Sequence, residues 1–100
     1  MSPLIVIAKV VANKESVEQL KSELLKLVAP TRQEEGCISY TLHQDNEDSS
    51  VFIFYETWQS LVHLERHIAS DHYRAYASAA EGLIAWKAVN KMTRLDDVSR

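Results

Sequence analysis

The spacing of apolar residues along the chain switches between the periods of strands and helices, and each switch predicts a new element. Residues 4–12 are rich in Val and Ile on both alternating faces, which is typical of a strand covered on two sides. From Asn13, a candidate N-cap, apolar residues recur every three or four positions up to residue 28 and predict an amphipathic helix. Pro30 lacks a backbone donor, so we expect a break there, before the turn that contains Gly36.

Two strands joined by a hairpin turn are predicted next. Residues 37–44 and 51–58 have strand composition, and the polar segment DNEDSS between them has turn composition. Along the second strand, Glu56 and Trp58 share one face with two phenylalanines, while the opposite face is also apolar. We therefore expect both faces of this strand to be covered, and the pKa of Glu56 to be perturbed by burial.

Two helices and a last strand complete the pattern. An apolar stripe over residues 61–68 predicts a short helix, Ser70 is a candidate N-cap for another, and residues 84–92 predict a strand. The order strand, helix, strand, strand, helices, strand is that of an α+β, ferredoxin-like βαββαβ fold with an antiparallel sheet. We expect one domain over residues 1–100, with a polar tail from about residue 96.

Composition narrows the possible partners. The chain has 100 residues, 25% of them charged, and a net charge of −3, so it offers no basic stripe for a nucleic acid backbone. A core of this size is thin, and helices can cover only one of the two apolar sheet faces. The simplest cover for the other face is a second copy of the sheet, which predicts a homodimer.

The N-terminal segment and the cysteine content bear on location. MSPLIVIAKVV lacks a basic leading region and is too short to span a membrane, so we expect no membrane association and a cytoplasmic protein. Cys37 is the single cysteine, which excludes an intrachain disulfide and agrees with a reducing compartment. No basic residue adjoins Cys37 in sequence, so a thiolate nucleophile has little support.

The segment HLERH resembles a zinc protease motif but lacks its spacing. That motif places the general base directly after the first histidine, whereas Glu65 comes one position later and would point away from a shared metal. His63 and His67 lie one turn apart, offset from the stripe of Leu61, Leu64 and Ile68. We expect one of the two histidines to be solvated, and no metal site.

One pair of residues and one single histidine are candidates for proton chemistry. Glu56 and Trp58, two apart on a strand, point into one space, where an indole can exclude water from a carboxylate. His67 can point inward near the helix end, where a neutral imidazole can accept a phenolic proton. The alternatives are a Glu56 paired with a lysine or arginine, and a boundary histidine satisfied by backbone.

Four further residues are candidates for substrate binding. His72 lies in the first turn of a helix, whose N-terminus keeps the ring neutral, although surface exposure is the alternative. Tyr73 and Tyr76 follow an Ala-rich stripe, and Tyr40 lies in the hairpin. For these tyrosines, core packing is the alternative to a hydroxyl contact with a ligand.

The segments EEGCISY, YETWQS, HLERH and DHYRAY occur in this order over nearly the whole chain. Together they resemble the antibiotic biosynthesis monooxygenase family, whose members form dimeric α+β barrels, and within it the quinol monooxygenase branch. That branch carries a similar run of Gly-Cys and Tyr, then Glu-x-Trp, then His-Leu-Glu-x-His, then a His and an Ala-Tyr on the next helix. As an ordered set these motifs are specific, although each one alone is weak.

The resemblance implies a cofactor-independent monooxygenase that oxidises a small quinol or polyphenolic molecule with O₂, without metal, haem or flavin. It also implies a homodimer with one cavity per subunit between helices and sheet. The matching positions for that cavity are Tyr40, Glu56, Trp58, His67, His72 and Tyr76. We expect His67, assisted by Glu56, to take the substrate proton.

Two other functions stay open and a third is disfavoured. A relative that processes a phosphorylated autoinducer has histidines matching His67 and His72 but differs around Trp58. A non-catalytic small-molecule-binding or stress-response dimer would use the same cavity without chemistry. Haem-degrading relatives need a histidine and an asparagine where this chain has Ala77 and Ala8.

Overall fold

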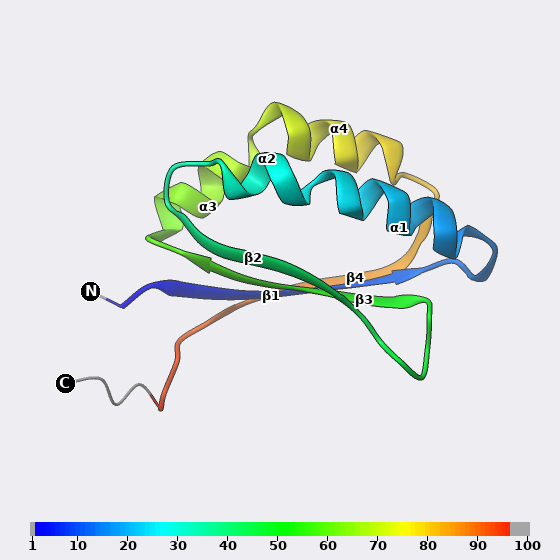
Figure 1. Cartoon of the computed structure of the whole chain (residues 1–100), viewed down its shortest axis with the longest axis horizontal. Coiled ribbons are helices and arrows are strands. Elements are labelled where there is room, and N and C mark those ends of the chain that lie inside the picture. The colour runs from blue at the N-terminus through cyan, green and yellow to red at the C-terminus, as the bar shows by residue number, and fades with distance from the viewer. Residues whose placement is uncertain (1, 97–100) are drawn as a thin grey trace.

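The computed structural model describes residues 2–96, and its elements follow the predicted order (Figure 1). The strands are β1 (Leu4–Ala12), β2 (Cys37–Gln44), β3 (Val51–Trp58) and β4 (Ile84–Met92). The helices are η1 (Lys14–Ser16), α1 (Val17–Lys26), α2 (Val28–Arg32), α3 (Leu61–Ile68) and α4 (Asp71–Ala79). The strand boundaries agree with the prediction because each strand is bordered by residues of turn composition.

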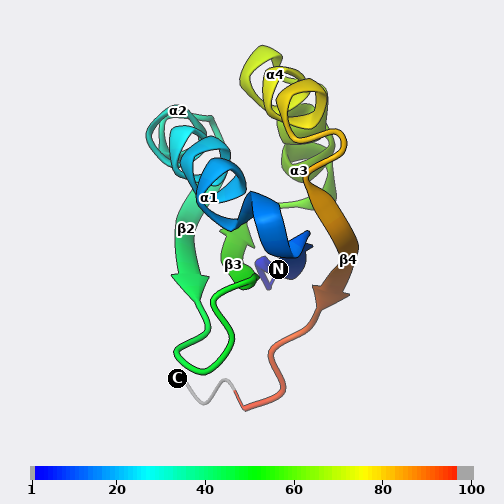
Figure 2. The ribbon, with the colours of Figure 1, turned by 90° about the vertical axis from the view of Figure 1, so that its right-hand side faces the viewer.

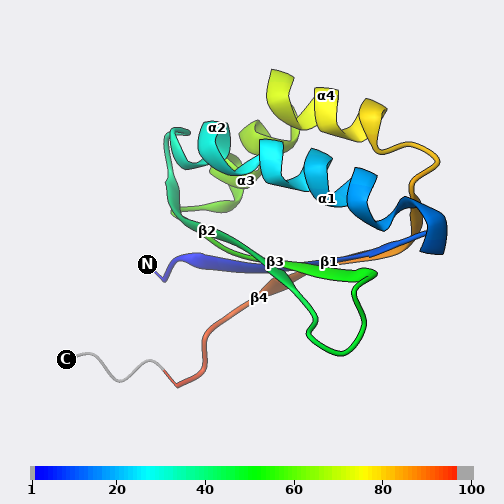
Figure 3. The same cartoon turned by 45° about the vertical axis from the view of Figure 1, so that its right-hand side comes forward.

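The four strands form one antiparallel sheet in the order β2-β3-β1-β4. All the helices cover the same face of this sheet, with α1 and α2 beside α3 and α4 (Figures 1 and 2). The turn between β2 and β3 projects away from the helices (Figure 3). This arrangement confirms the predicted α+β ferredoxin-like fold, whereas the dimeric part of that prediction stays a prediction.

Alternation along the central strands builds the core between sheet and helices. Alternate residues of β1 are buried, and on β3 the buried residues are Phe52, Phe54, Glu56 and Trp58. Leu20 and Leu24 of α1 are fully buried against this face. Burial of each such leucine stabilises the fold by about 1.5–3 kcal/mol.

The opposite face of the sheet carries large apolar side chains and no helix. Tyr55, Trp86 and Met92 are 43%, 53% and 45% exposed. The register pairs Val11 with Trp86 and Ile5 with Met92, which places these apolar residues on the same face. The expectation that both faces of β3 are covered therefore holds for the helix-covered face, and cover for the other face stays a prediction.

The first helix breaks at Leu27 and not at Pro30, which corrects the predicted position. α2 begins at Val28, so Pro30 falls in its first turn, where a backbone N–H has no acceptor within the helix. Asn13 was predicted as an N-cap, but its side chain makes no cap bond and donates to the carbonyl oxygen of Gly82 at 2.9 Å. That contact ties the start of the helical segment to the loop before β4.

The apolar stripe predicted for α3 is also rotated in the structure. Leu64 is buried, whereas Leu61 and Ile68 are each 48% exposed. The second buried residue of α3 is His67, so a polar side chain occupies the inward face where the pattern predicted Ile68.

The polar tail is predicted from about residue 96, and its residues 97–100 lie outside the described part of the chain. Within residues 2–96, no helix has the length and apolar character needed to cross a membrane. The cytoplasmic location stays a prediction.

Candidate active site

A cavity of about 430 Å³ lies on the helix-covered side of the sheet, bordered by all four strands, α3 and α4. This volume is in the range of small-molecule sites, which are typically about 300–1,000 Å³. Its walls are mostly apolar, and five of the predicted site residues are in its lining: Tyr40, Glu56, His67, Tyr73 and Tyr76. Trp58 and His72, also predicted to bind substrate, lie outside the lining. Trp58 contacts Glu56, and His72 contacts His67.

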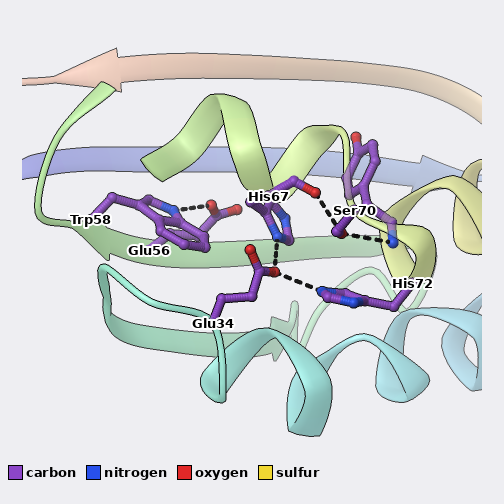
Figure 4. Close-up of polar contacts among 7 residues, drawn as sticks. Glu34, Glu56, Trp58, His67, Ser70 and His72 are labelled. Carbon is purple, nitrogen blue, oxygen red and sulfur yellow. Dashed lines mark hydrogen bonds and ion pairs between the residues drawn. The ribbon is translucent and has the colours of Figure 1, made fainter. Parts of the chain in front are cut away.

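Glu56 and Trp58 are brought together by strand alternation, as the sequence predicts. The indole Nε1 of Trp58 donates to Glu56 Oε1 at 2.9 Å, and both residues are buried (Figure 4). Burial raises the pKa of Glu56 to about 7, and the charge of Glu34 adds to this rise while the Trp58 hydrogen bond opposes it. Within residues 2–96, no lysine or arginine forms an ion pair with Glu56. The carboxyl group can therefore exchange a proton near neutral pH.

His67 points inward from α3. Ser60 caps the start of the helix by accepting from the backbone N–H of His63, and the resulting register turns His67 toward the sheet. His67 is 2% exposed, and its ring centroid lies 4.9 Å from that of Trp58 and 5.1 Å from that of Tyr73. Burial lowers the pKa of His67, although the neighbouring Glu34 opposes the change. The imidazole is thus held neutral in an aromatic environment.

Glu34 completes the site and was not predicted from the sequence. Its Oε2 accepts from His67 Nδ1 at 2.6 Å and from His72 Nε2 at 2.6 Å (Figure 4). Because a carboxylate oxygen accepts, the proton of His67 lies on Nδ1, and Nε2 is the nitrogen left to receive another proton. The sequence signal was the acidic pair before Gly36, but no periodicity in a turn indicates which acid points inward.

The turn that carries Glu34 depends on Gly36. Gly36 has φ 86°, which a residue with a side chain rarely adopts. A Cβ atom there would also lie 2.2 Å from the ring of His63. His63 itself bonds Ser60 through Nδ1 at 2.8 Å, so the two histidines of HLERH do not share a site. One of the two was expected to be solvated, but His63 is half-buried and His67 is buried.

Three tyrosines line the cavity, one from β2 and two from α4. Tyr40 stacks on Phe54 with ring centroids 4.7 Å apart, and burial raises the pKa of Tyr40 far above its ordinary range. Burial raises the pKa of Tyr76 to about 12 and also raises the pKa of Tyr73. At neutral pH these phenols stay protonated, so each can donate a hydrogen bond to a ligand.

The Glu34, His67 and His72 cluster also has the composition of a metal site. One ligand-type atom from each residue lies within 4.8 Å of the others. No thiolate joins the set, and Cys37 is half-buried with its pKa raised by burial and then by the charges of Glu34 and Glu56. A reactive Cys37 is therefore not supported.

Comparison with known proteins identifies the family. The profile of the antibiotic biosynthesis monooxygenase family matches residues 3–79. The chain belongs to this family. The match covers the strand and turn that carry Glu56, Trp58 and Glu34, and the helices that carry His67 and His72.

Similar proteins in the antibiotic biosynthesis monooxygenase family and among solved structures span nearly the whole chain. The structure of PA3566 from Pseudomonas aeruginosa is 38% identical and has a TM-score of 0.92, covering 95% of this chain and 96% of that one. Rv0793 from Mycobacterium tuberculosis is 30% identical, with a TM-score of 0.89 and coverage of 98% and 100%.

A further relative carries a substrate class in its name. YgiN of Escherichia coli strain K12, named a probable quinol monooxygenase, is 34% identical over 70 residues. That match covers 60% of this chain and 65% of YgiN. Family membership and the ferredoxin-like fold are thus established.

Proposed function

We propose that this protein is a cofactor-independent monooxygenase that oxidises a quinol or polyphenolic small molecule with O₂. The observation that supports it most is a buried imidazole, His67, held by a carboxylate at the wall of an aromatic cavity. Family membership supports oxygen chemistry, and the name of YgiN supports a quinol. Such a site offers a phenolic substrate a proton acceptor beside apolar and aromatic walls that exclude water.

The chemistry of O₂ defines what the protein must supply. Triplet dioxygen reacts slowly with a neutral phenol, because the phenol is a closed-shell molecule and a poor electron donor. Its phenolate passes one electron to O₂, which gives a phenoxyl radical and superoxide. Removing the phenolic proton is therefore the step that side chains can accelerate without a metal.

His67 is the proposed base. Its Nδ1–H is committed to Glu34, so Nε2 takes the proton of the substrate hydroxyl. The imidazolium that results lies beside the Glu34 carboxylate, which stabilises its charge. His72 donates to the same oxygen and keeps the carboxylate in place.

Glu56 and the tyrosines have supporting roles in this proposal. Glu56 has a pKa of about 7, so it can accept or return a proton on the opposite side of the cavity from α4. Tyr73 and Tyr76 orient the substrate ring by packing and by donating hydrogen bonds. Trp58 is fully buried, so it fixes Glu56 and does not stack on the substrate.

We also propose that the protein acts as a homodimer through the open face of the sheet. Tyr55, Trp86 and Met92 give this face the apolar surface that a stable interface requires. Light scattering coupled to size exclusion should give twice the chain mass, and Trp86→Glu should shift the protein toward the monomer. A monomer at all concentrations would contradict the proposal.

The test of the activity is O₂ uptake by chelator-treated protein with a panel of hydroquinones and polyphenols, each compared with its own autoxidation. Uptake above autoxidation that survives the chelator supports the proposal. Tight binding of panel members without uptake would favour a non-catalytic binding protein. Uptake that chelation abolishes would contradict cofactor independence.

A further inference from the structure

The cluster of Glu34, His67 and His72 has a chemical use beyond holding an imidazole. We propose that these three residues form a binding site for a divalent transition-metal ion of the Zn²⁺ and Co²⁺ class. The ligand atoms are Glu34 Oε2, His67 Nδ1 and His72 Nε2, which lie within 4.8 Å of one another (Figure 4). Two imidazoles and one carboxylate are a common donor set for such ions.

The charge of the cluster favours a cation. Within residues 2–96, the ion pairs of Glu34 are with His67 and His72, and none is with a lysine or arginine. The carboxylate of Glu34 is the acidic group of the cluster, and its side chain is only 14% exposed. A divalent ion would compensate this charge where water screens it poorly.

The geometry needs a small side-chain adjustment to receive the ion. Each imidazole nitrogen lies 2.6 Å from the shared oxygen, which is a hydrogen-bond distance. Metal bonds of about 2.0–2.2 Å place the ligands of one ion about 3.2–3.5 Å apart, so the carboxylate must retract by about 0.6–0.9 Å. The two imidazole nitrogens, which lie within 4.8 Å of each other, must come to the same separation. Glu34 lies in the turn between α2 and β2, and rotation about its side-chain bonds can provide this movement.

Metal binding would change the state of His67. The ion takes Nδ1, so the ring proton moves to Nε2, and His72 tautomerises in the same way. Nε2 can then no longer accept a proton from a substrate. The metal-bound protein therefore has no free base at His67. Three protein ligands would leave one coordination position of the ion for water.

The experiment measures metal binding directly and uses no substrate, so its outcome is independent of the proposed activity. Chelator-stripped full chain is titrated with Co²⁺ and followed by visible absorption, and with Zn²⁺ by calorimetry. We expect one ion per chain. His72→Ala, in which a partly exposed ligand is lost, should weaken binding at least about 100-fold, the upper range for loss of even an outer partner.

Two further variants make the result specific. Glu34→Gln keeps the size of the side chain and removes its charge, and it should weaken binding as His72→Ala does. His43→Ala removes an exposed histidine on β2, which contacts the carbonyl oxygen of Ile53, and should bind as the parent does. Absence of stoichiometric binding, or equal affinity in the folded parent, His72→Ala and Glu34→Gln proteins, would overturn the site.

Discussion

The two halves of the site place their polar groups by different means. Glu56 and Trp58 lie on one strand, and the pleat fixes both side chains on the buried face. Glu34, His67 and His72 come from a turn and two helices, and they meet through hydrogen bonds between segments far apart in the sequence. The strand half is part of the core, whereas the turn and helix half is assembled around a single carboxylate.

This difference predicts that substitutions in the two halves change different quantities: the free energy of unfolding for the strand half and turnover for the turn and helix half. Side chains in the strand half bear on packing and on the protonation of Glu56, so their loss should appear in unfolding experiments. Glu34 and the cavity-facing tyrosine hydroxyls contribute little apolar area, so their loss should appear in turnover. Four variants, described from the largest expected effect to the smallest, test this division.

Trp58→Ala should cause the largest change, a loss of about 3–5 kcal/mol in the free energy of unfolding. Trp58 is fully buried, and its removal creates a cavity and leaves Glu56 without its donor. Denaturant unfolding at fixed protein concentration measures the change. Trp58→Phe, which keeps much of the packing, should cost less, and a loss below about 1 kcal/mol for Trp58→Ala would contradict a core role for this half.

Glu56→Gln should remove a pH dependence of stability worth about 3 kcal/mol. The pKa of Glu56 is raised from 4.5 to about 7 in the folded protein, so the folded state holds a proton that the unfolded state loses. The stabilisation that the raised pKa of Glu56 gives to the folded state is therefore fully present below pH 4.5 and is lost as the pH rises through 7. The stability difference between the two proteins, measured from pH 4.5 to 8, should change in that direction, and a constant difference would show that Glu56 titrates normally.

Glu34→Gln should lower turnover about 10–100-fold, the usual effect of losing a carboxylate that orients a functional imidazole. The amide cannot stabilise an imidazolium at His67 as the carboxylate does. Glu35→Gln is the matched control, because Glu35 is the neighbouring residue and its side chain is 84% exposed. Steady-state O₂ uptake is measured for both variants. Equal losses of turnover in the two would contradict the role assigned to Glu34.

Tyr73→Phe should lower turnover by about 2–10-fold, the worth of one hydrogen bond. The ring of Tyr73 contacts His67 and lines the cavity, and the substitution removes only the hydroxyl. Tyr55→Phe, on the open face of the sheet, should have no effect on kcat. A change in unfolding free energy without any change in kcat or KM would assign Tyr73 to packing alone.

The strand half could be predicted from the sequence because strand alternation has only two faces. Placing Glu56 and Trp58 together requires only that residues 51–58 form a strand, and the register then follows. Polar residues in a turn carry no such period. Glu34 and Glu35 are adjacent and chemically equivalent in sequence, but one is held by two histidines and the other is exposed.

Helix faces were predicted less well than strand faces. The apolar residues Leu61 and Ile68 indicated an inward stripe, but His67 takes the inward position because Glu34 satisfies its ring nitrogen. A buried polar side chain with a partner from a distant segment competes with an apolar one, and the partner is invisible in a local pattern.

The most direct test of His67 as the base is O₂ uptake by chelator-treated His67→Ala with the best quinol substrate, measured over pH 6 to 8 against the parent. His63→Ala, one turn earlier on α3, is the control, and unfolding experiments on all three proteins confirm that they are folded. We expect a rate about 10²–10⁴-fold below the parent for His67→Ala and a nearly parental rate for His63→Ala. Parental turnover by folded His67→Ala throughout this pH range would contradict the assignment of His67 as the base.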